Sequence, residues 1–545
     1  MPESTAAPPE EQAKYPFDPN RAAWQPKYNR WIVALTVTLA TFMEVLDTSI
    51  ANVSLPHIAG SLGASMEEST WVLTSYLVSN AIVLPISAWL SRLIGRKRFY
   101  MSCVALFTVS SFFCGLAPSL GALVFFRVLQ GAGGGGLQPS EQAILADAFP
   151  ASMRGMAFAV YGMAVVVAPA IGPTLGGWIT DNYTWHWVFY INVPIGIISL
   201  LLTNKLVDDP PYLVEQQKVF RSGGSKVDWW GLGLVAVGIS SLQLVLDKGQ
   251  EKDWFATHWI TAALVVAIVC LVTWVIWEWR HPDPIVDIRL FKHRNFSIAI
   301  FFTFVLGIVL FGTTVMLPEF MQTLLGYPAV TAGLALAGGG AVMMLTMPLA
   351  GALQSRLDPR WLMGFGFAST GIALFYMSQH ITLGMDFGTL FYLRVLQTAG
   401  LAFIFIPSSV LNYVGIEPGK NNQVSAINSF VRNIGGSLGI ALITNYLTRS
   451  TQQHQTFLVS HATPGSPIYE SIVNGMAGAL QKAGLDQVEA RHQSMGRVYD
   501  MIQQQAAGLA YVDTIAVLAL VVLALTPLVL ILRKPKGRPA GGGLH

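Results

Sequence analysis

The stretch that decides the fold is RVLQGAG at residues 127–133, because RVLQTAG repeats it at residues 394–400, 267 positions later. Each copy lies inside an apolar segment, where an arginine costs roughly 2.5 kcal/mol or more to insert into hydrocarbon. Arginines in such places usually mark a transport pathway. The sequence therefore predicts a membrane protein with two related halves, each of which buries one arginine.

The composition is typical of polytopic membrane proteins. Hydrophobic residues make up 53% of the 545 residues, charged residues 12%, and the mean hydropathy is +0.51. Soluble proteins carry about 25% charged residues. The net charge of +3 is small, and no long basic run of the kind that binds nucleic acid is present. Residues 1–30 lack the apolar core of a signal peptide, so we expect the first apolar segment to be retained.

Apolar runs long enough to cross about 30 Å of hydrocarbon recur along the whole chain. The predicted fold class is an all-α polytopic membrane protein with fourteen transmembrane helices. We expect these helices near residues 31–54, 70–90, 99–117, 120–143, 155–180, 187–203, 230–246, 258–279, 296–317, 329–353, 361–378, 388–408, 425–447 and 511–532.

An even number of spans puts both termini on one side of the membrane. The loops on that side contain many basic residues, such as Arg92 and Lys97, whereas the opposite short loops contain only Lys248 and Lys252. By the positive-inside rule, we expect both termini in the cytoplasm. The segment 448–510 is then expected on the outer side, although it is too long to count in this rule.

A second pair of similar segments supports the repeat. SRL at residues 91–93, followed by Arg96, matches SRL at residues 355–357, followed by Arg360. The two halves then stand in parallel relation, and a transported compound should bind at their interface near the midplane. The predicted parts are a cytoplasmic tail (1–30), a six-helix bundle (31–203), a linker with two inserted transmembrane helices (204–295), a second six-helix bundle that includes 448–510 (296–532), and a cytoplasmic tail (533–545).

Glu44, Asp47 and Arg127 are the candidates for proton coupling. Glu44 and Asp47 are three residues apart on the first span, so they share one helical face. Two carboxylates held close in a medium of low dielectric make each other harder to ionise, so such a pair can bind and release a proton. Arg127 is a permanent cation that can favour an ionised carboxylate. The alternative is structural, with Asp47 hydrogen-bonded to neighbouring helices, Glu44 lining a wet cavity and Arg127 in a fixed ion pair.

Polar and aromatic side chains in the spans are candidates for the substrate pathway. A broad apolar cavity with few fixed polar contacts would suit an amphipathic compound. The alternative for each aromatic residue is packing between helices or a place in the interfacial belt. The candidates are Gln130, Gln138, Glu141, Asn192, Tyr76, Phe126, Tyr161 and, in the second copy of the repeat, Arg394 and Gln397.

The glycine run at residues 131–136 is not a nucleotide site. No Gly-Lys-Ser or Gly-Lys-Thr follows it, so we expect these glycines to let helices approach closely. Without an ATP site, transport must draw on an ion gradient, and no cofactor is expected besides the proton gradient. The histidines of 448–510 lack the spacing of a zinc site, and no metal site is expected. Cys103 and Cys114 lie about 16 Å apart on one predicted helix, so no disulfide framework is implied.

Three motifs resemble those of the major facilitator superfamily, and specifically of its fourteen-span drug:proton antiporters of the EmrB type. They are LDTSIANVSLP at residues 46–56, the arginine and glycine motif at residues 127–136, and GPTLGG at residues 172–177. The resemblance implies the major facilitator fold, a location in the bacterial inner membrane and no enzyme activity. It also implies that Gly172, Pro173, Gly176 and Gly177 form an antiporter motif that seals the path against proton leak.

The cytoplasmic gate departs from the superfamily pattern. That pattern has Gly, then Asp four residues on, then Gly-Arg-Lys, whereas this chain has Ala88 and Arg92 before Gly95, Arg96 and Lys97. The charge relay that the family ascribes to this carboxylate therefore does not transfer. EmrB-type relatives tend to carry a base here, so the resemblance to that type holds.

The resemblance also implies partners. EmrB-type exporters work with a periplasmic adaptor protein and an outer-membrane channel, as a tripartite efflux pump, so the segment 448–510 is a candidate docking surface. The alternatives for this segment are a lid or a solvated hairpin. A connection of this length should have its own structure or partner.

The predicted function is proton-coupled multidrug efflux by alternating access, of the kind that confers antibiotic resistance. The alternative is export of one endogenous compound, such as a siderophore, fatty acid or lipid. A membrane-embedded enzyme would need a metal cluster or catalytic constellation on one membrane face, and the sequence shows none. A sensor without transport activity is disfavoured by Asp47, Arg127 and the glycine motifs.

Overall fold

Every regular element in the described part of the chain is a helix. The computed structural model describes residues 24–222, 227–463 and 465–532. These ranges contain no β-strand, as the apolar spans predict. The predicted tails, 1–30 and 533–545, lie outside the described residues apart from 24–30.

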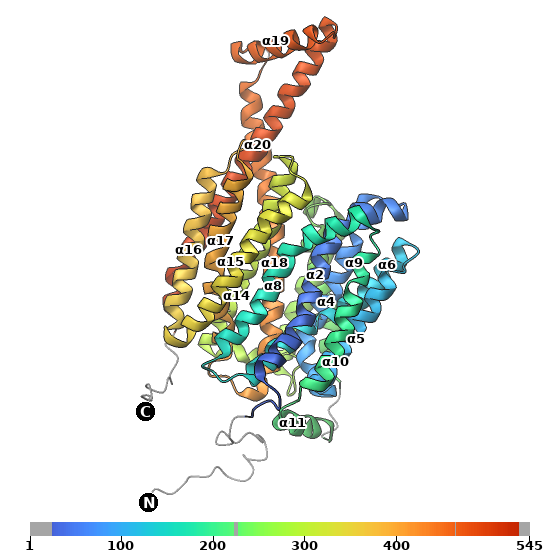
Figure 1. Cartoon of the computed structure of the whole chain (residues 1–545), viewed down its shortest axis with the longest axis vertical. Coiled ribbons are helices and arrows are strands. Elements are labelled where there is room, and N and C mark those ends of the chain that lie inside the picture. Colours follow the sequence, from blue (N-terminus) through green and yellow to red (C-terminus); the bar gives the residue numbers. More distant parts are fainter. Residues whose placement is uncertain (1–23, 223–226, 464, 533–545) are drawn as a thin grey trace, which may run out of the picture.

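The described part of the first half, drawn in blue to teal in Figure 1, contains five helical segments long and apolar enough to cross a membrane, together with the helix Arg96–Cys114. Some crossings consist of two helices that follow one another directly. The helices are α2 (Arg30–Leu62), α3 (Met66–Ser69), α4 (Trp71–Ile94), α5 (Arg96–Cys114), α6 (Leu120–Gly134), α7 (Leu137–Ala148), α8 (Arg154–Asn182), α9 (Trp187–Tyr190) and α10 (Asn192–Leu206).

The second half follows after a linker that carries the inserted pair. The linker helices are α11 (Pro211–Ser222), α12 (Trp229–Lys248), η1 (Trp254–Ala256), α13 (His258–Arg280) and η2 (Ile288–Lys292). The second half contains α14 (Arg294–Thr323), α15 (Ala329–Arg356), α16 (Pro359–His380), α17 (Phe387–Leu411), η3 (Pro418–Lys420), α18 (Asn421–His461), α19 (Pro467–Lys482), α20 (Gln487–Leu525) and η4 (Pro527–Ile531).

Polar caps begin several of these helices where the sequence leaves an apolar run. Asn29 accepts a hydrogen bond from the backbone of Trp31 at the start of α2, and Ser119 caps α6 in the same way. Ser65 and Glu68 form a complete capping box at α3. These caps satisfy backbone groups at the ends of helices that otherwise lie in an apolar environment.

The two bundles meet at contacts made by α8 and by α18. Within the first half α2 packs on α8 and α4 packs on α6, and within the second half α14 packs on α18 and α15 on α17. The halves meet where α8 packs on α15 and where α18 packs on α4 and α7. At the α8–α15 contact, the oxygen of Gly351 lies 2.9 Å from the position that a Cβ on Gly155 would take. The predicted architecture of two bundles with an inserted pair is therefore confirmed.

Thirteen helical segments in the described ranges are long and apolar enough to cross a membrane. The remaining predicted span, near 99–117, forms α5, which packs on α6 and α10. Three basic residues at its start, Arg96, Lys97 and Arg98, lower its mean hydropathy. The architecture is confirmed, whereas the count of fourteen spans stays a prediction.

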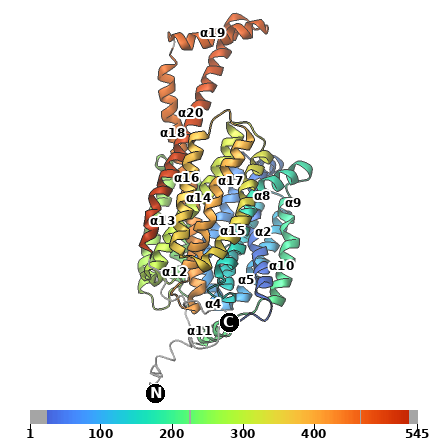
Figure 2. The same ribbon diagram turned by 60° about the vertical axis from the view of Figure 1, so that its left-hand side comes forward.

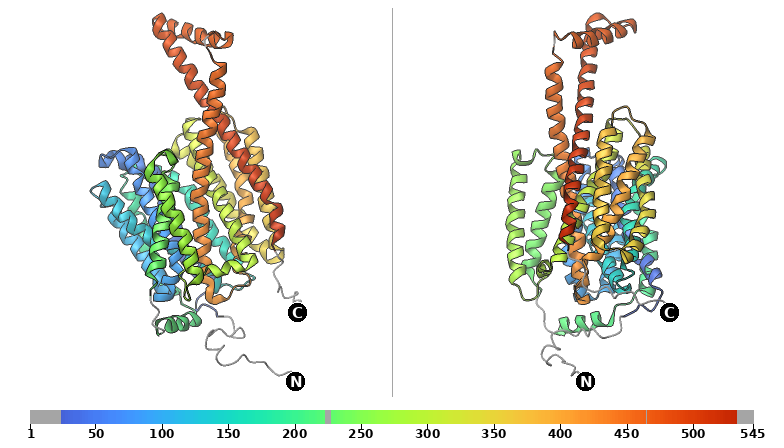
Figure 3. Two further views of the ribbon diagram at one scale, coloured as in Figure 1. Left: turned by 180° about the vertical axis from the view of Figure 1, so that it is seen from behind. Right: turned by 90° about the vertical axis from the view of Figure 1, so that its left-hand side faces the viewer.

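The inserted helices α12 and α13 lie at the side of the bundles (Figure 3). Helix α12 contacts α4 in the first half and α18 in the second. Helix α13 contacts mainly α12 and exposes apolar side chains such as Val265, Ile268 and Val272. This exposed apolar surface is what a lipid-facing helix presents.

A helical hairpin projects from the side opposite to the start of α2 (Figures 1 and 2). Helix α18 runs from Asn421 to His461 and α20 from Gln487 to Leu525 without interruption, so each continues from a membrane span into the hairpin. Helix α19 crosses the tip, where Ala477, Leu480 and Ala490 form a small apolar core. Neither long helix contains a proline to end it, so each continues through the base of the hairpin.

The fourth predicted span is interrupted. Helix α6 ends at Gly134 and α7 begins at Leu137, whereas the sequence predicted one helix over 120–143. Four consecutive glycines, residues 133–136, stand at the break. Glycine lowers helix stability by about 1 kcal/mol relative to alanine, which explains the break.

Candidate functional site

A buried ion pair lies in the first half. Arg127 of α6 donates from Nη1 to Oδ2 of Asp47 of α2 at 2.6 Å, and both side chains are fully buried. The other carboxylate oxygen, Oδ1, accepts from Gln130 at 3.0 Å and from Asn192 of α10 at 2.6 Å. Arg127 Nε donates to the backbone oxygen of Val72 at 3.0 Å. The predicted contact between Asp47 and Arg127 is present, and three side chains from two other helices hold its carboxylate.

Glycines allow Arg127 to reach this place. The position that a Cβ on Gly131 would take lies 2.4 Å from the oxygen of Tyr76, and that for Gly135 lies 2.5 Å from the oxygen of Asn80. Helix α6 therefore contacts α4 backbone to backbone, as the glycine run predicts. Gly172 of the GPTLGG motif packs closely on the side chain of Ser49 of α2, because a Cβ on Gly172 would lie 2.2 Å from its Oγ.

A second polar cluster surrounds Glu44, one turn along α2 from Asp47. Glu44 accepts hydrogen bonds from Gln138 at 2.9 Å, Asn80 at 3.2 Å and the hydroxyl of Tyr76 at 3.4 Å. The ring of Tyr76 lies 4.2 Å from the guanidinium carbon of Arg127. The two carboxylates thus have separate hydrogen-bond partners. The coupling of the two carboxylates stays a prediction, and Tyr76 connects their two clusters.

Arg432 connects the Glu44 cluster to the second half. It lies on α18, is 3% exposed, and donates to Gln138 Oε1 at 2.6 Å and to the hydroxyl of Tyr161 of α8. Tyr161 in turn donates to Gln138 at 3.1 Å. Arg432 was not among the residues predicted from the sequence. Its signal was available, because the residue lies inside the predicted span 425–447 and an ionisable residue in a span is a site candidate by default.

Further hydrogen bonds join the halves below this arginine. Gln142 of α7 donates to Ser429 at 2.7 Å and accepts from Asn428 at 2.6 Å, both on α18. Glu141, the neighbour of Gln142, is fully buried and accepts from Thr38 of α2 at 2.6 Å. Glu141 therefore contacts α2 and lies outside both carboxylate clusters.

The side at which α2 begins is closed by polar contacts between the halves. Arg96 pairs with Asp147 at 2.5 Å, and Asp147 accepts from Asn421 of α18. Asn422 donates to Ser91 at 3.1 Å. These contacts hold the ends of α4, α5 and α7 against the start of α18.

Other residues of the predicted cytoplasmic gate contact the linker between the two halves. Arg92 pairs with Asp283 at 3.3 Å, after the inserted pair. The backbone N–H of Lys97 donates to Asp209. Gly95 has a φ of +94° at the turn between α4 and α5, a backbone conformation that is strained for any residue with a side chain.

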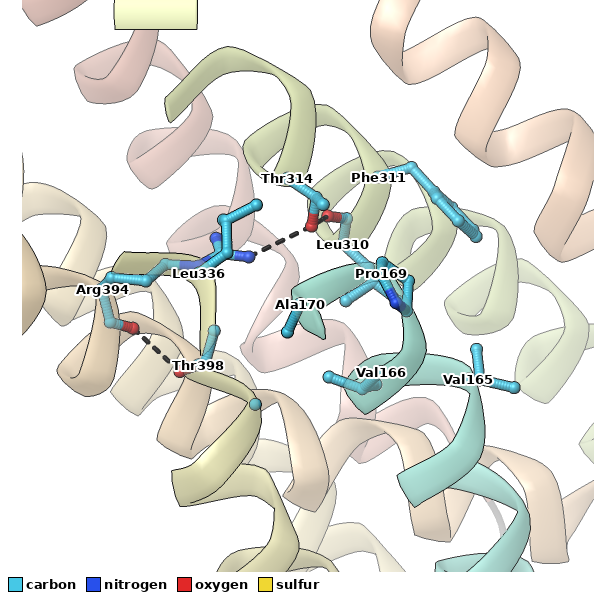
Figure 4. A pocket seen from close by; sticks show the side chains of 11 residues that line it. Val165, Val166, Pro169, Ala170, Leu310, Phe311, Thr314, Leu336, Arg394 and Thr398 are labelled. Atoms are coloured by element: carbon cyan, nitrogen blue, oxygen red, sulfur yellow. Dashed lines mark hydrogen bonds between the residues drawn. The ribbon is translucent and has the colours of Figure 1, made fainter. Parts of the chain in front are cut away.

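Arg394, the second copy of Arg127, lies elsewhere in the structure, at a cavity between the halves (Figure 4). It donates to Thr313 at 3.0 Å, Thr314 at 3.1 Å and Gln397 at 2.6 Å. The cavity is small, about 20 Å³ in volume. Its walls come from α8 of the first half and α14, α15 and α17 of the second: Val165, Val166, Pro169, Ala170, Leu310, Phe311, Thr314, Leu336, Gly340, Arg394 and Thr398.

Phe126, a candidate for the substrate pathway, lies apart from the two polar clusters. Its ring stacks on Phe113 of α5 at 5.3 Å between centroids, within an aromatic and aliphatic cluster of the first half. Residues 126 and 127 are neighbours on α6, so they point in different directions, and Arg127 takes the inward one. The structure brings together the other candidates of the first half, Asp47, Arg127, Gln130 and Asn192 in one cluster and Glu44, Tyr76, Gln138 and Tyr161 in the other.

The sequence and the fold are similar to those of several known proteins. The sequence profile of the Major Facilitator Superfamily matches residues 37–440. The chain is 35% identical to the multidrug export protein EmrB of Escherichia coli K12 over 512 residues, 94% of this chain and 97% of that one. It is 36% identical to the fatty acid resistance protein FarB of Neisseria gonorrhoeae over 511 residues, again 94% and 97%. The proton:xylose symporter XylE shares the fold, with a TM-score of 0.57 at 14% identity over 91% of this chain and 96% of that one.

Proposed function

Because this chain belongs to the Major Facilitator Superfamily, a family of transporters rather than enzymes, we propose that it exports hydrophobic and amphipathic compounds in exchange for protons. Two relatives support this class of compound, since one is a multidrug export protein and the other a fatty acid resistance protein. The observation that carries the proton coupling is the fully buried pair of Asp47 and Arg127.

Protonation of Asp47 changes the energy of this site. An ionised Asp47 balances the charge of Arg127 and accepts from Gln130 and Asn192. A proton on the carboxylate removes that balance, whereas the guanidinium stays charged at any physiological pH. A buried, uncompensated cation is costly, so the protonated protein favours a different packing of the helices around it. Differential proton binding between two packings is what coupling requires.

The contacts around Tyr76 provide a route from Asp47 to the second half. Tyr76 lies against Arg127 and donates to Glu44, and Glu44 accepts from Gln138. Gln138 accepts from Arg432 on α18, the helix whose first turn holds the gate at Asp147. Repacking at Asp47 can therefore reach the contacts that close one side of the protein.

We place the side where α2 begins in the cytoplasm, because its loops carry most of the basic residues. The membrane is then the bacterial inner membrane and the hairpin of α18, α19 and α20 projects outward. Its apolar side chains, including Phe457, Ile468 and Val488, are strongly exposed. This surface supports docking of a periplasmic adaptor protein that leads to an outer-membrane channel. The tip lies beyond the bundles (Figure 2), so the hairpin is no lid on them.

The second candidate function is export of a single endogenous compound. The similarity to a fatty acid resistance protein over 94% of the chain favours it specifically. The two candidates differ in breadth, since a multidrug exporter protects cells against several unrelated compounds and a dedicated exporter against one.

The decisive experiment measures proton flux in proteoliposomes with a panel of hydrophobic cations, weak acids and neutral compounds. We expect several unrelated compounds to drive proton movement through the unaltered protein. Asp47→Asn keeps the hydrogen-bonding shape but cannot exchange a proton, so compound-driven proton flux should fall at least about tenfold.

The matched control is Asp513→Asn. Asp513 is a partly exposed carboxylate near the base of the hairpin, where it contacts His454. Its change to an amide should leave proton flux within about twofold of the unaltered protein. Full flux in Asp47→Asn would show that the coupling site lies elsewhere.

A further inference from the structure

The two arginine sites follow the same local plan. Thr314 stands 267 residues after Asp47, the separation that also relates Arg394 to Arg127. Arg127 donates from Nη1 to the glutamine three residues on, Gln130, at 2.8 Å. Arg394 donates from Nη1 to Gln397 at 2.6 Å. The second site therefore repeats the first one, with a threonine where the first has its aspartate.

This exchange leaves Arg394 without a counter-charge. Its acceptors are the hydroxyls of Thr313 and Thr314 and the amide oxygen of Gln397. No carboxylate among the described residues lies within ion-pair distance of it. The side chain is 5% exposed, and its Nε has no hydrogen-bond partner within the same ranges. A buried cation without an anion is costly, whereas the equivalent Arg127 has the Asp47 carboxylate as its counter-charge.

The cavity beside Arg394 is otherwise mostly apolar (Figure 4). Val165, Val166 and Ala170 approach from α8 of the first half, and Leu310 and Leu336 from the second half. Its polar side chains are Arg394 itself and two threonines, Thr314 and Thr398, both within hydrogen-bond reach of the arginine's own atoms. A cation at one wall of an apolar cavity suits an anionic group joined to an apolar body.

We propose that this cavity binds amphipathic organic anions, with the anionic group on Arg394 in the place that the Asp47 carboxylate takes in the first half. The apolar body then lies between α8 and the helices of the second half, which must separate to admit it because the cavity is small in this packing. This assignment rests on the proposed export function for its physiological role, but the binding itself is independent of proton coupling. Because both halves line the cavity, a bound anion would also bridge them.

The test measures equilibrium binding of three ten-carbon probes to the full chain in lipid nanodiscs. The probes are decanoate, decanol and decyltrimethylammonium, which share an apolar chain and differ in charge, and empty nanodiscs give the background. Arg394→Gln removes the cation, and we expect at least about a tenfold loss of decanoate affinity, the usual effect of losing one charged hydrogen bond. Affinity for decanol should stay within about twofold.

Two further variants keep the test independent of folding. Thr314→Asp supplies the missing carboxylate, so it should raise the melting temperature and lower decanoate affinity by at least about tenfold, because an internal anion occupies the arginine. Arg394→Lys keeps the charge but not the planar fork, and should retain part of the affinity. Decanoate affinity that is unchanged in both Arg394→Gln and Thr314→Asp overturns the proposal.

Transport separates this proposal from the proposed function. If Arg394→Gln loses decanoate binding while export of a hydrophobic cation continues with proton flux, both stand. If none of the compounds drives proton movement through the unaltered protein, but decanoate binding still depends on Arg394, the export function fails and the anion site stands. If export of cations is normal and decanoate binding ignores Arg394, the anion site fails alone.

Discussion

At the scale of single residues, the protein separates a paired arginine from an unpaired one. Arg127 and Arg394 occupy equivalent places in a repeat. Asp47 forms an ion pair with Arg127, whereas Thr314 only accepts a hydrogen bond from Arg394. The charge balance of the first arginine therefore depends on the protonation of Asp47, whereas the second arginine is available to bind an anion from outside the protein. A single change of carboxylate to hydroxyl accounts for the difference.

Substitution of Arg432 should impair transport while leaving substrate binding nearly unchanged. It joins α18 to Gln138 and Tyr161 across the interface. Arg432→Gln is too short to bond both partners, so we expect transport in proteoliposomes to fall about tenfold or more. Binding of a neutral substrate to purified protein should change by less than about threefold.

Arg491→Gln provides the comparison for that variant. Arg491 forms an exposed ion pair with Glu470 in the hairpin, and such pairs contribute little. Its loss should leave transport in proteoliposomes unchanged. Equal effects of the two substitutions would contradict a special role for Arg432.

At the scale of elements, close helix contacts depend on glycine. Gly131 faces the backbone of α4 at a distance that no Cβ tolerates, whereas Gly121 on the same helix has open space around it. Gly131→Ala should therefore destabilise the protein by about 1–3 kcal/mol, as overpacking does. Gly121→Ala should be neutral or slightly stabilising because alanine favours the helix.

Thermal unfolding of the two variants in detergent, followed by tryptophan fluorescence, checks this prediction. The comparison is internal, because both substitutions add one methyl group to α6. Similar melting temperatures would mean that α6 can shift away from α4 at little cost.

The hairpin is an element whose role should differ between purified protein and cells. It projects from the bundles on continuous α18 and α20, and a small apolar core lies at its tip. Replacing residues 455–503 by a short Gly-Ser linker should leave proton-coupled transport in proteoliposomes within about threefold, because the buried clusters lie in the bundles. Compound resistance of cells should fall strongly if an adaptor docks there. Loss of transport in both settings would instead assign the hairpin to the transport cycle itself.

At the scale of the whole molecule, the structure shows one side closed by contacts between the halves. Ser91 and Asn422 meet there at 3.1 Å, one from each half. A disulfide between Ser91→Cys and Asn422→Cys, after replacement of the three native cysteines, should abolish transport under oxidising conditions. Reductant should restore it, because alternating access requires this contact to open. Full activity of the oxidised, cross-linked protein would contradict opening at this position.

Much of the fold and part of the candidate site could be predicted from the sequence alone. Most spans and the choice of Asp47 and Arg127 as candidates follow from hydropathy and the cost of burying charge, which are properties of single segments. The grouping into two halves follows from the repeat of one segment by another. The relation between Gly131 and its neighbouring helix also followed, because only glycine allows such an approach.

Only the tertiary structure decided which helical faces meet. It gave Glu44 and Asp47 separate partners, turned Phe126 away from the interface, joined Arg432 to Gln138 and left Arg394 unpaired beside a cavity. Lipid tails are as apolar as the helices, so hydrophobicity drives a segment into the membrane but does not choose its rotation against a neighbour. That choice comes from packing and hydrogen bonds between segments far apart in the chain, which no single segment contains.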